Sequence, residues 1–477
     1  MSNHPNVVFL VLDSVRYDRT SVGGHHRDTT PNLRRIADSA AGESFDTAIA
    51  HSKHTPKSSA SILTGKYPGE HRFWYDSDAL NESIPTVAES FQEAGYTTAC
   101  VSNNSFVGHE TGLSRGFEEY TLLPKTPLEI LRTVGIWPTA KFVANVRRHS
   151  AGFQRDIHRH SGAYLTTSLV RQQLDALESQ SDPFFLYAHY NQPHRAYYPP
   201  LAWFDTYADA FDMSTHEAGE FSMDVHHNLT ERVAEGCPFS DDEWAALKAL
   251  YDTEIKYTDT FVGELFDLIR RRFDDTIVVV TADHGEHFGE RGALAHRYAL
   301  DDPLLHVPLV TWGLDAVSTE TPVQHSDVMR TLLEMAEADS SFVNGVDLRS
   351  ETREFAVSQD SDVSIEPVLE FNPEFDGEQF FPGVDHTIPE RTAITTESHR
   401  YVRGVDGTRV LYRLPDEDVA DDVSADEPEL LEELDGKLER WLADHPHVEK
   451  DRASGRQALT DDTKDRLVQM GYLDEDL

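Results

Sequence analysis

The sequence predicts an α/β protein with a large, mostly parallel sheet flanked by helices, plus a small C-terminal α+β subdomain. Apolar runs rich in β-branched residues, which suit central strands, occur at 6–12, 184–190 and 276–281. Helix-like segments separate these runs, and strand–helix alternation is typical of a parallel sheet that is covered on both faces. The subdomain is expected because the pattern changes after residue 340.

The remaining elements of the main domain continue this alternation. A helix is expected at 30–37 and a second at 83–94, followed by a strand at 97–102. Apolar residues near helical spacing predict a long amphipathic helix over 241–272. Together with the three apolar runs, these segments account for the sheet and its covering helices.

The C-terminal part has a different composition. Residues 351–390 are acidic and contain several Pro and Gly, which indicates irregular structure. Strands are expected at 395–402 and 408–414, on either side of the hairpin signal Asp406-Gly407. An amphipathic helix is expected at 430–442. These elements predict a unit that packs on the main domain.

Two domains are therefore expected, a main domain over 1–345 and a small sheet-plus-helix subdomain over 390–477. Within the main domain, residues 125–160 carry seven Lys and Arg against two acidic residues, a net charge of +5. Apolar residues between these charges predict amphipathic helices. The segment is interpreted either as a cap packed on the main domain or as a lid for an anionic substrate or a membrane surface.

The overall charge is strongly negative. The chain has 477 residues, with 42 Lys and Arg against 84 Asp and Glu, a formal charge of −42. This balance argues against nucleic-acid binding, because a phosphate backbone requires cationic neutralisation. An acidic, Lys-poor surface is typical of proteins adapted to high salt. We expect the protein to lose structure in low salt; a circular dichroism spectrum unchanged there would contradict this.

Cysteine content and hydropathy bear on the cellular compartment. The two cysteines, Cys100 and Cys237, exclude a disulfide framework and a Cys-rich metal site. The apolar run at 7–12 is too short for a signal peptide core and has no cationic flank. No stretch approaches about 18 uninterrupted apolar residues. The cytoplasm is therefore the expected location.

Acidic residues and a histidine follow two of the strongest predicted strands. Asp13 comes directly after the run at 6–12, and Asp283-His284 come just after the run at 276–281. Ligand sites in parallel sheets gather at the carboxyl ends of the strands, so we expect these residues at one sheet edge. Two carboxylates with one imidazole suit a divalent metal ion. The sequence does not distinguish among Ca²⁺, Mn²⁺, Mg²⁺ and Zn²⁺.

One segment carries a family resemblance. Residues 55–68, Thr-Pro-Lys-Ser-Ser-Ala-Ser-Ile-Leu-Thr-Gly-Lys-Tyr-Pro, resemble the signature of the sulfatase family in the alkaline phosphatase superfamily. Further family-like segments occur in the family's order, at 6–13, 30–33, 189–194, 251–257, 281–286, 306–309 and the Gly471-Tyr-Leu ending. The resemblance covers nearly the whole chain.

The resemblance implies an alkaline-phosphatase-like sandwich whose domain over 1–345 is catalytic. It implies hydrolysis of a sulfate or phosphate ester in a glycan, a lipid or a small molecule. One divalent metal ion would be held by Asp13, Asp283 and His284, together with the residue at the nucleophile position.

The nucleophile position departs from the family pattern. The family's Cys or Ser, which is oxidised to formylglycine, falls on Thr55. Threonine cannot supply that aldehyde, so no formylglycine is expected. Superfamily relatives that act on phosphodiesters use a metal-bound Thr directly, which makes Thr55 the expected nucleophile and favours phosphoesters. The other interpretation of Thr55 is a helix N-cap, and both roles are compatible.

Other site positions are assigned by the same resemblance. The family's Arg, four residues after the nucleophile, is replaced by Ser59, and its Lys-x-His pair by Asn103 or Asn104. These Asn residues are interpreted either as substrate contacts or as turn residues. Lys57 is a third expected substrate contact. The expected leaving-group acids or anion contacts are two histidines, His194 and His296.

Two alternatives to a hydrolase are retained. One is a transferase of the phosphoglycerol or phosphoethanolamine type that acts on a glycan or lipid alcohol. The other is a non-catalytic homologue that binds an anionic glycan. The retained carboxylates and imidazoles argue against the second alternative. The sequence leaves the oligomeric state open.

Overall fold

A seven-stranded sheet forms the centre of the structure, a computed structural model that describes residues 4–73, 78–296, 299–361, 372, 390–415 and 422–445. The expected Gly471-Tyr-Leu ending lies outside the described residues, as does the part of the subdomain after residue 445. The strands of the central sheet are β1 (Asn6–Leu12), β2 (Gly42–Ser44), β3 (Thr97–Ser102), β4 (Glu119–Leu122), β5 (Phe184–Tyr190), β6 (Thr276–Ala282) and β9 (Leu309–Trp312).

The sheet is mostly parallel, as predicted. Its strand order is β2-β9-β6-β1-β5-β3-β4, and only β9 pairs antiparallel, with β2 on one side and β6 on the other. Leu12, the last residue of β1, pairs with Tyr190 of β5 and with Ala282 of β6. The chain therefore leaves these three strands at the same level of one sheet edge.

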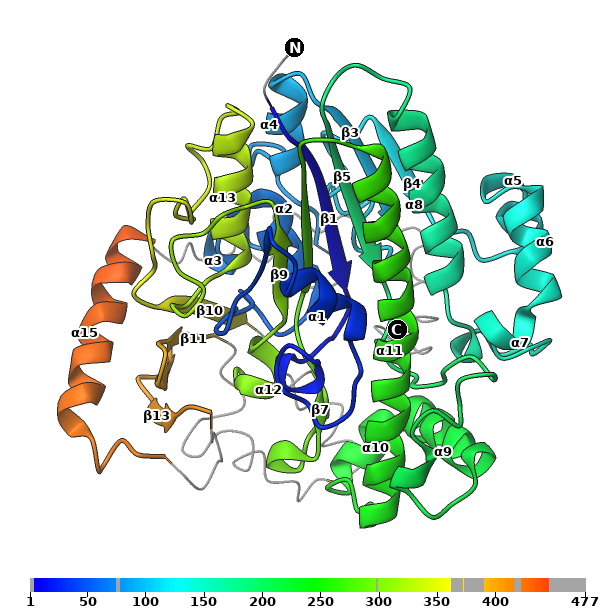
Figure 1. The fold of residues 1–477 in the computed structure, drawn as a ribbon. Coiled ribbons are helices and arrows are strands. Elements are labelled where there is room, and N and C mark those ends of the chain that lie inside the picture. Colours follow the sequence, from blue (N-terminus) through cyan, green and yellow to red (C-terminus); the bar gives the residue numbers. More distant parts are fainter. Residues whose placement is uncertain are drawn as a thin grey trace.

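Helices cover both faces of this sheet (Figure 1). One face carries α1 (Pro31–Ala37), α8 (Ala163–Leu177) and α11 (Asp241–Arg272), and the other carries α2 (Thr55–Thr64), α4 (Val87–Glu93) and α13 (His325–Met335). The long helix predicted at 241–272 is confirmed. The helix predicted at 83–94 begins later, at Val87, because Thr86 and Glu89 form a capping box there.

A second, four-stranded antiparallel sheet lies beside the main one. It contains β10 (Ala356–Ser361), β11 (Glu390–Thr395), β12 (His399–Gly404) and β13 (Arg409–Arg413), and α15 (Pro428–Asp444) packs on it. The hairpin at Asp406-Gly407 and the C-terminal helix agree with the prediction.

Two expectations for this region were wrong. The single strand predicted at 395–402 is interrupted by a turn, because the Thr396 hydroxyl accepts hydrogen bonds from the backbone of Ser398 and His399. The stretch predicted to be irregular contributes β10 to the sheet. The second sheet therefore begins ahead of the expected boundary at 390.

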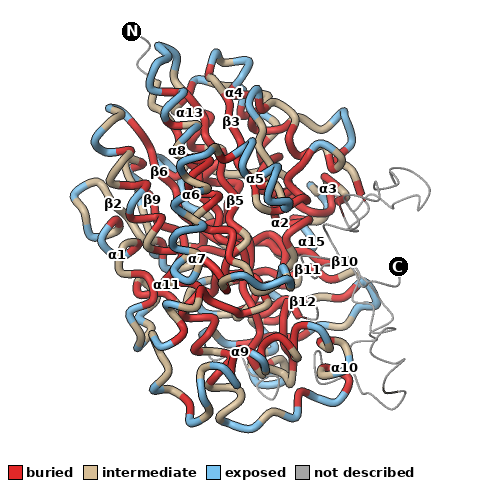
Figure 2. Tube along the Cα trace, turned by 90° about the vertical axis from the view of Figure 1, so that its right-hand side faces the viewer, coloured by how far each residue is buried: buried red, intermediate tan, exposed pale blue. Residues whose placement is uncertain are grey.

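The basic segment folds into three short helices, α5 (Pro127–Thr133), α6 (Ile136–Ala144) and α7 (Val146–His149). We call residues 125–160 the cap. Its helix α6 packs on α8, and the cap projects from the body on the side away from α15 (Figure 1). None of the three helices contains a buried residue, in contrast to the central strands (Figure 2).

The remaining short elements surround the carboxyl edge of the central sheet or connect its helices. They are α3 (Pro68–His71), α9 (Thr215–His227), α10 (Leu229–Ala234), α12 (Asp302–Leu305), β7 (His287–Phe288) and β8 (Leu294–Ala295), with 3-10 turns at Tyr17–Arg19, Ile157–Arg159, Ala208–Ala210 and Glu290–Gly292. Within the described part of the chain, none of the helices has the length and apolar character that crossing a bilayer requires.

Candidate active site

Asp13, Asp283 and His284 meet at the carboxyl edge of the central sheet. Asp13 directly follows β1, and Asp283 and His284 directly follow β6, its parallel neighbour. One side-chain ligand atom from each residue lies within 4.8 Å of the others, and all three residues are fully buried. The structure thus brings together the three residues that the sequence placed at one edge.

Thr55 also lies beside these three residues. It is the first residue of α2, and its Oγ1 lies 3.0 Å from Nε2 of His284 and 3.5 Å from Oδ1 of Asp13. The N-cap of the helix is His54, so the interpretation of Thr55 as the N-cap is wrong, and Thr55 is instead the first helical residue. Because backbone N–H groups at a helix N-terminus attract anions, an anionic group beside Thr55 would be stabilised there.

The donor atoms of the cluster fit a divalent cation. Nδ1 of His284 lies 2.8 Å from the Gly285 carbonyl oxygen, so Nδ1 carries the proton and Nε2 keeps its lone pair toward Thr55. Oδ2 of Asp283 is buried and accepts no hydrogen bond from the described residues. A buried carboxylate oxygen without a donor is costly, and a cation would satisfy it. Two carboxylates with one imidazole are a common ligand set for divalent metals.

The electrostatics of the two carboxylates lead to the same conclusion. Burial raises the pKa of Asp283, and the nearby charge of Asp13 raises it further. Burial acts in the same direction on Asp13, but His194, His189 and His284 hold the pKa of Asp13 below its ordinary value. Two neighbouring buried carboxylates repel each other, and positive charge between them would relieve this repulsion.

The two asparagines after β3 have different surroundings. Nδ2 of Asn104 donates to Oδ2 of Asp13 at 3.0 Å, so Asn104 orients that carboxylate. The Asn103 amide instead lies against Gly162, so close that a Cβ there would meet it at 2.3 Å. His189, which was not among the predicted site residues, also contacts this carboxylate, with Nε2 3.5 Å from Oδ2 of Asp13. The sequence indication for His189 was its position as the first residue of the family-like segment at 189–194.

Three histidines line the other side of the cluster. The His296 ring lies 4.4 Å from the His284 ring and 5.1 Å from the His194 ring, between centroids. His54 lies 5.5 Å from His296 by the same measure. Burial lowers the pKa of His194 to about 4. The two predicted leaving-group acids therefore lie side by side, next to a predicted metal ligand.

Glu286 supports His296 and was not among the predicted site residues. Its Oε1 lies 2.9 Å from Nδ1 of His296, and burial raises the pKa of Glu286 to about 7. The bond occupies Nδ1 and fixes the orientation of the ring. The sequence did hold an indication of Glu286, since it is the last residue of the family-like segment at 281–286.

Comparison with known proteins assigns the family. The model of the family described as Sulfatase matches residues 5–338, well over half of the chain. The chain belongs to the sulfatase family. As a member of this family it is an enzyme, a sulfuric or phosphoric ester hydrolase.

Relatives of this sulfatase-family protein include a choline-sulfatase of Rhizobium meliloti (strain 1021), 26% identical over 363 residues that cover 70% of this chain and 67% of that protein. A Haloferax volcanii protein named low-salt glycan biosynthesis sulfotransferase Agl7 is 23% identical over 361 residues, covering 74% and 65%. The crystal structure of a phosphonate monoester hydrolase of Agrobacterium radiobacter has the same fold, with a TM-score of 0.71, 21% identity and coverage of 92% and 96%.

Lys57 takes part in a buried ion pair in this sulfatase-family protein. Lys57 and Lys53 both bind the carboxylate of Asp360 on β10, and all three residues are buried. The neighbouring Gln359 adds two links, from its backbone N–H to the His51 carbonyl and from the Gly69 N–H to its own Oε1, each 2.9 Å long. The second sheet thus holds the segment that leads into Thr55. The predicted substrate contact of Lys57 stays a prediction.

Neutralising Asp360 is expected to destabilise the fold. In Asp360→Asn the two buried ammonium groups lose the carboxylate between them, and breaking a buried ion pair costs about 3–5 kcal/mol. Denaturant unfolding measures this loss. Glu397→Gln, an exposed change in the turn between β11 and β12, serves as the control. A loss below about 1 kcal/mol in Asp360→Asn would show that the ion pair is not structural.

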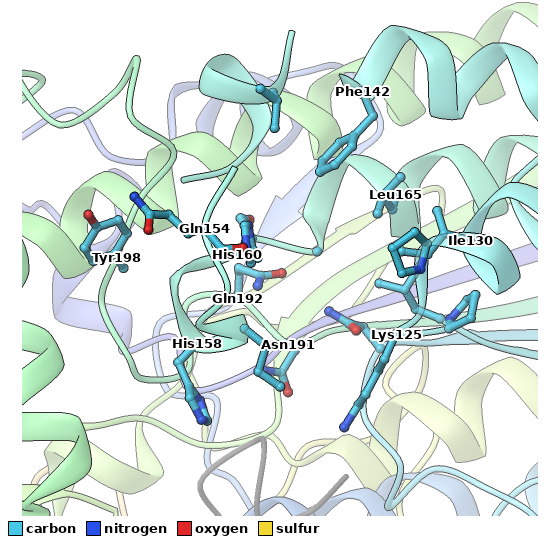
Figure 3. A pocket seen from close by; sticks show the side chains of 18 of the residues that line it. Lys125, Ile130, Phe142, Gln154, His158, His160, Leu165, Asn191, Gln192 and Tyr198 are labelled. Carbon is cyan, nitrogen blue, oxygen red and sulfur yellow. The ribbon is translucent and has the colours of Figure 1, made fainter. Parts of the chain in front are cut away.

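A cavity of about 570 Å³ lies between the cap, α8 and the loop after β5. It reaches the active site at Asn103 and His194. Most of its lining is apolar, and the apolar members include Leu122, Leu123, Ile130, Phe142, Val143, Val146, Phe153, Ile157 and Leu165. In Figure 3 Phe142, Leu165 and Ile130 lie on one side of the cavity with Lys125 beside Ile130, and His158 and Tyr198 lie on the other.

Glu254 of α11 also lines this cavity. It is 3% exposed, and its Oε2 has no hydrogen-bond partner among the described residues. Burial raises the pKa of Glu254 to about 8. At neutral pH the carboxyl group is therefore mostly protonated and can donate a hydrogen bond into the cavity.

This pKa makes stability depend on pH. The folded chain binds the Glu254 proton more tightly than the unfolded chain, whose ordinary value is 4.5. The stability that this proton contributes is complete below pH 4.5 and is lost as pH rises through 8, by about 1.4 kcal/mol per pKa unit. Glu254→Gln is expected to remove the loss, so its melting temperature exceeds that of the wild type at pH 9. Equal gains from Glu264→Gln, an exposed change on the same helix, would refute this.

Proposed function

We propose that this protein hydrolyses a sulfate or phosphate ester, with phosphoesters favoured, through Thr55 as nucleophile and one divalent cation held by Asp13, Asp283, His284 and Thr55. The observation that carries the proposal is the position of the Thr55 hydroxyl, 3.0 Å from Nε2 of His284 at the N-terminus of α2. A divalent cation bound there would lower the pKa of the hydroxyl and stabilise negative charge on the transferred group.

The first half of the reaction transfers the acid group to Thr55. Its hydroxyl proton passes to solvent, while Oγ1 forms a bond to sulfur or phosphorus and the ester bond breaks. Asp13 stays ionised throughout, because the neighbouring histidines hold its pKa below the ordinary value. The departing alcohol oxygen takes a proton from His194 or His296. Although burial disfavours a protonated His194, an anionic ester beside it raises the pKa of the ring. Substrate binding itself therefore supplies the acid.

The second half releases the product. The histidine that gave its proton now accepts one from a water molecule, whose oxygen attacks the sulfur or phosphorus. The bond to Oγ1 breaks, and Thr55 recovers a proton from solvent. Thr55 and the histidine return to their starting states, and free sulfate or phosphate leaves.

The experiment is a substrate panel in high salt. Aryl sulfate, phosphomonoester and phosphodiester substrates are each tested with Mg²⁺, Mn²⁺, Zn²⁺ and Ca²⁺ on metal-stripped protein. We expect metal-dependent turnover of a phosphoester, and acid quenching during turnover should leave the transferred group on the peptide that contains Thr55, detected by mass spectrometry. Turnover of sulfate esters alone would refute the preference for phosphoesters. Metal-independent turnover would refute the cation.

A transferase is the second candidate. It is favoured by the Haloferax volcanii relative, whose name is that of a sulfotransferase. In a transferase an alcohol would replace water in the second half-reaction. Adding glycerol or another alcohol acceptor would then raise turnover and yield the new ester, whereas a hydrolase yields only the free anion.

A further inference from the structure

The cap carries most of the exposed apolar side chains of the described structure. Nine large hydrophobic residues are exposed in the described part of the chain, and seven of them belong to the cap, between residues 128 and 157. They are Leu128, Leu131, Ile136, Trp137, Val143, Phe153 and Ile157. Trp137 is 79% exposed and Phe153 is 84% exposed. Exposed apolar side chains gathered on one small segment mark an interaction surface.

The same segment carries unpaired positive charge. Five exposed cations of the cap form no ion pair with a carboxylate among the described residues. They are Arg132, Lys141, Arg147, Arg148 and Arg155. The whole chain has a formal charge of −42, so most of its surface repels anions. The cap is therefore a cationic, apolar surface on an otherwise acidic protein.

The cavity beneath the cap opens onto this surface. Val143, Phe153 and Ile157 line the cavity and are also exposed to solvent. At its other end the cavity reaches His194, next to the metal cluster. A mostly apolar cavity thus connects the cap surface with the active site, and polar residues such as Asn191 and Gln192 line it near His194. Its volume of about 570 Å³ is within the range of about 300–1,000 Å³ typical of ligand pockets.

We propose that the substrate is an amphiphilic ester taken from an anionic lipid surface, with the cap resting on that surface and the hydrocarbon part of the alcohol in the cavity. The sulfate or phosphate group then reaches Thr55 past His194. The carboxyl group of Glu254 offers a hydrogen bond to a polar group of the substrate near the start of its hydrocarbon part. This inference rests on the ester hydrolase function proposed above.

A lipid surface accounts for all three features at once. Its headgroups supply the anions for the cap cations, its interface suits Trp137, and its hydrocarbon fills an apolar cavity that opens at the surface. A second copy of the chain would offer carboxylates to the cations. It would not supply a hydrocarbon group to fill the cavity.

The lipid contact is tested by vesicle binding. Full-length protein is sedimented with vesicles of phosphatidylglycerol and phosphatidylcholine, and Trp137 emission is followed. We expect binding, a blue shift that is absent in Trp137→Phe, and at least tenfold weaker binding in Ile136→Ser/Trp137→Ser. Neither Ile136 nor Trp137 lines the cavity, so turnover of a short soluble ester should not change in that variant.

The control is Val317→Ser/Val405→Ser, which removes two exposed apolar side chains outside the cap. It should bind vesicles as the wild type does. Absence of wild-type binding, or equal loss in the cap and control variants, would overturn the lipid contact. Size-exclusion chromatography distinguishes a second copy. A wild-type dimer that dissociates in the cap variant, with no vesicle binding, would assign the surface to self-association and overturn the proposal.

The substrate class is tested with methyl, hexyl and dodecyl esters that carry the head group preferred in the substrate panel. The wild-type kcat/KM should rise at least tenfold from methyl to dodecyl, and Phe142→Ser in the cavity should flatten this series. Turnover of soluble aryl esters with equal kcat/KM for every chain length would overturn this inference and leave the proposed function standing. No turnover of any ester would overturn the proposed function itself, while vesicle binding would still report on the cap.

Discussion

Thr55→Ala is expected to lower kcat at least about 10³-fold on whichever ester the protein turns over. The hydroxyl is the group placed to attack, and water in its place would lack its fixed position at the N-terminus of α2. Steady-state kinetics in high salt with the preferred cation measure the change. Thr55→Ser keeps the hydroxyl and should stay within about tenfold of the wild type.

The matched control for this variant is Thr64→Ala. Thr64 is a buried threonine at the other end of the same helix, and its hydroxyl bonds only to local backbone, at the Ala60 carbonyl and the Lys66 N–H. Its loss should affect stability more than kcat. If Thr55→Ala keeps most of its activity with an unchanged circular dichroism spectrum, Thr55 is not the nucleophile. If Thr55→Ala loses activity because it unfolds, its melting temperature will be lower than that of the wild type.

Asp283→Asn is expected to reduce divalent cation affinity at least about 100-fold, since even residues that merely support metal ligands contribute 10- to 100-fold. Melting temperature provides a readout that does not depend on activity. Wild-type protein stripped with a chelator should gain about 2.7 kcal/mol of stability at a cation concentration 100 times its Kd. The variant should gain much less at the same concentration.

Without cation, the order of stability should be the reverse, with Asp283→Asn more stable than the wild type. Burial and the charge of Asp13 raise the pKa of Asp283, so above that pKa its ionised form destabilises the stripped fold. The Asn variant lacks this cost and is expected to be the more stable of the two without cation. Asp267→Asn, at an exposed ion pair with Arg35, is the control and should respond to cation as the wild type does. A variant that is less stable under both conditions would contradict the assignment.

Much of the central fold could be predicted because its signals are local. The apolar run at 184–190 matches β5, and the amphipathic pattern at 241–272 matches α11. The proximity of Asp13 to Asp283 followed from one rule, since neighbouring parallel strands end at the same sheet edge. The strands β10 and β11 escaped prediction because each has only two apolar residues, adjacent in sequence (Ala356 and Val357, Ala393 and Ile394), and therefore neither an apolar run nor an alternating pattern.

The parts of the site that could not be predicted depend on contacts between distant residues. Lys57 lies two residues after Thr55, which suggested a substrate contact, but its carboxylate partner Asp360 is 303 residues away in sequence. Nothing in the local pattern indicates that partner. His189 and Glu286 lay within family-like segments, but only the packed structure shows which carboxylate or imidazole each contacts.

The link between the second sheet and the segment before Thr55 has a consequence for fragments of this protein. The match to the family model ends at residue 338, which suggests an expression boundary near there. A fragment cut at that point would lack Gln359 and Asp360, which hold the backbone of His51 and the side chains of Lys53 and Lys57. The smallest catalytically competent piece is therefore expected to extend beyond the region that the family model matches, because a sheet outside that match helps to position Thr55.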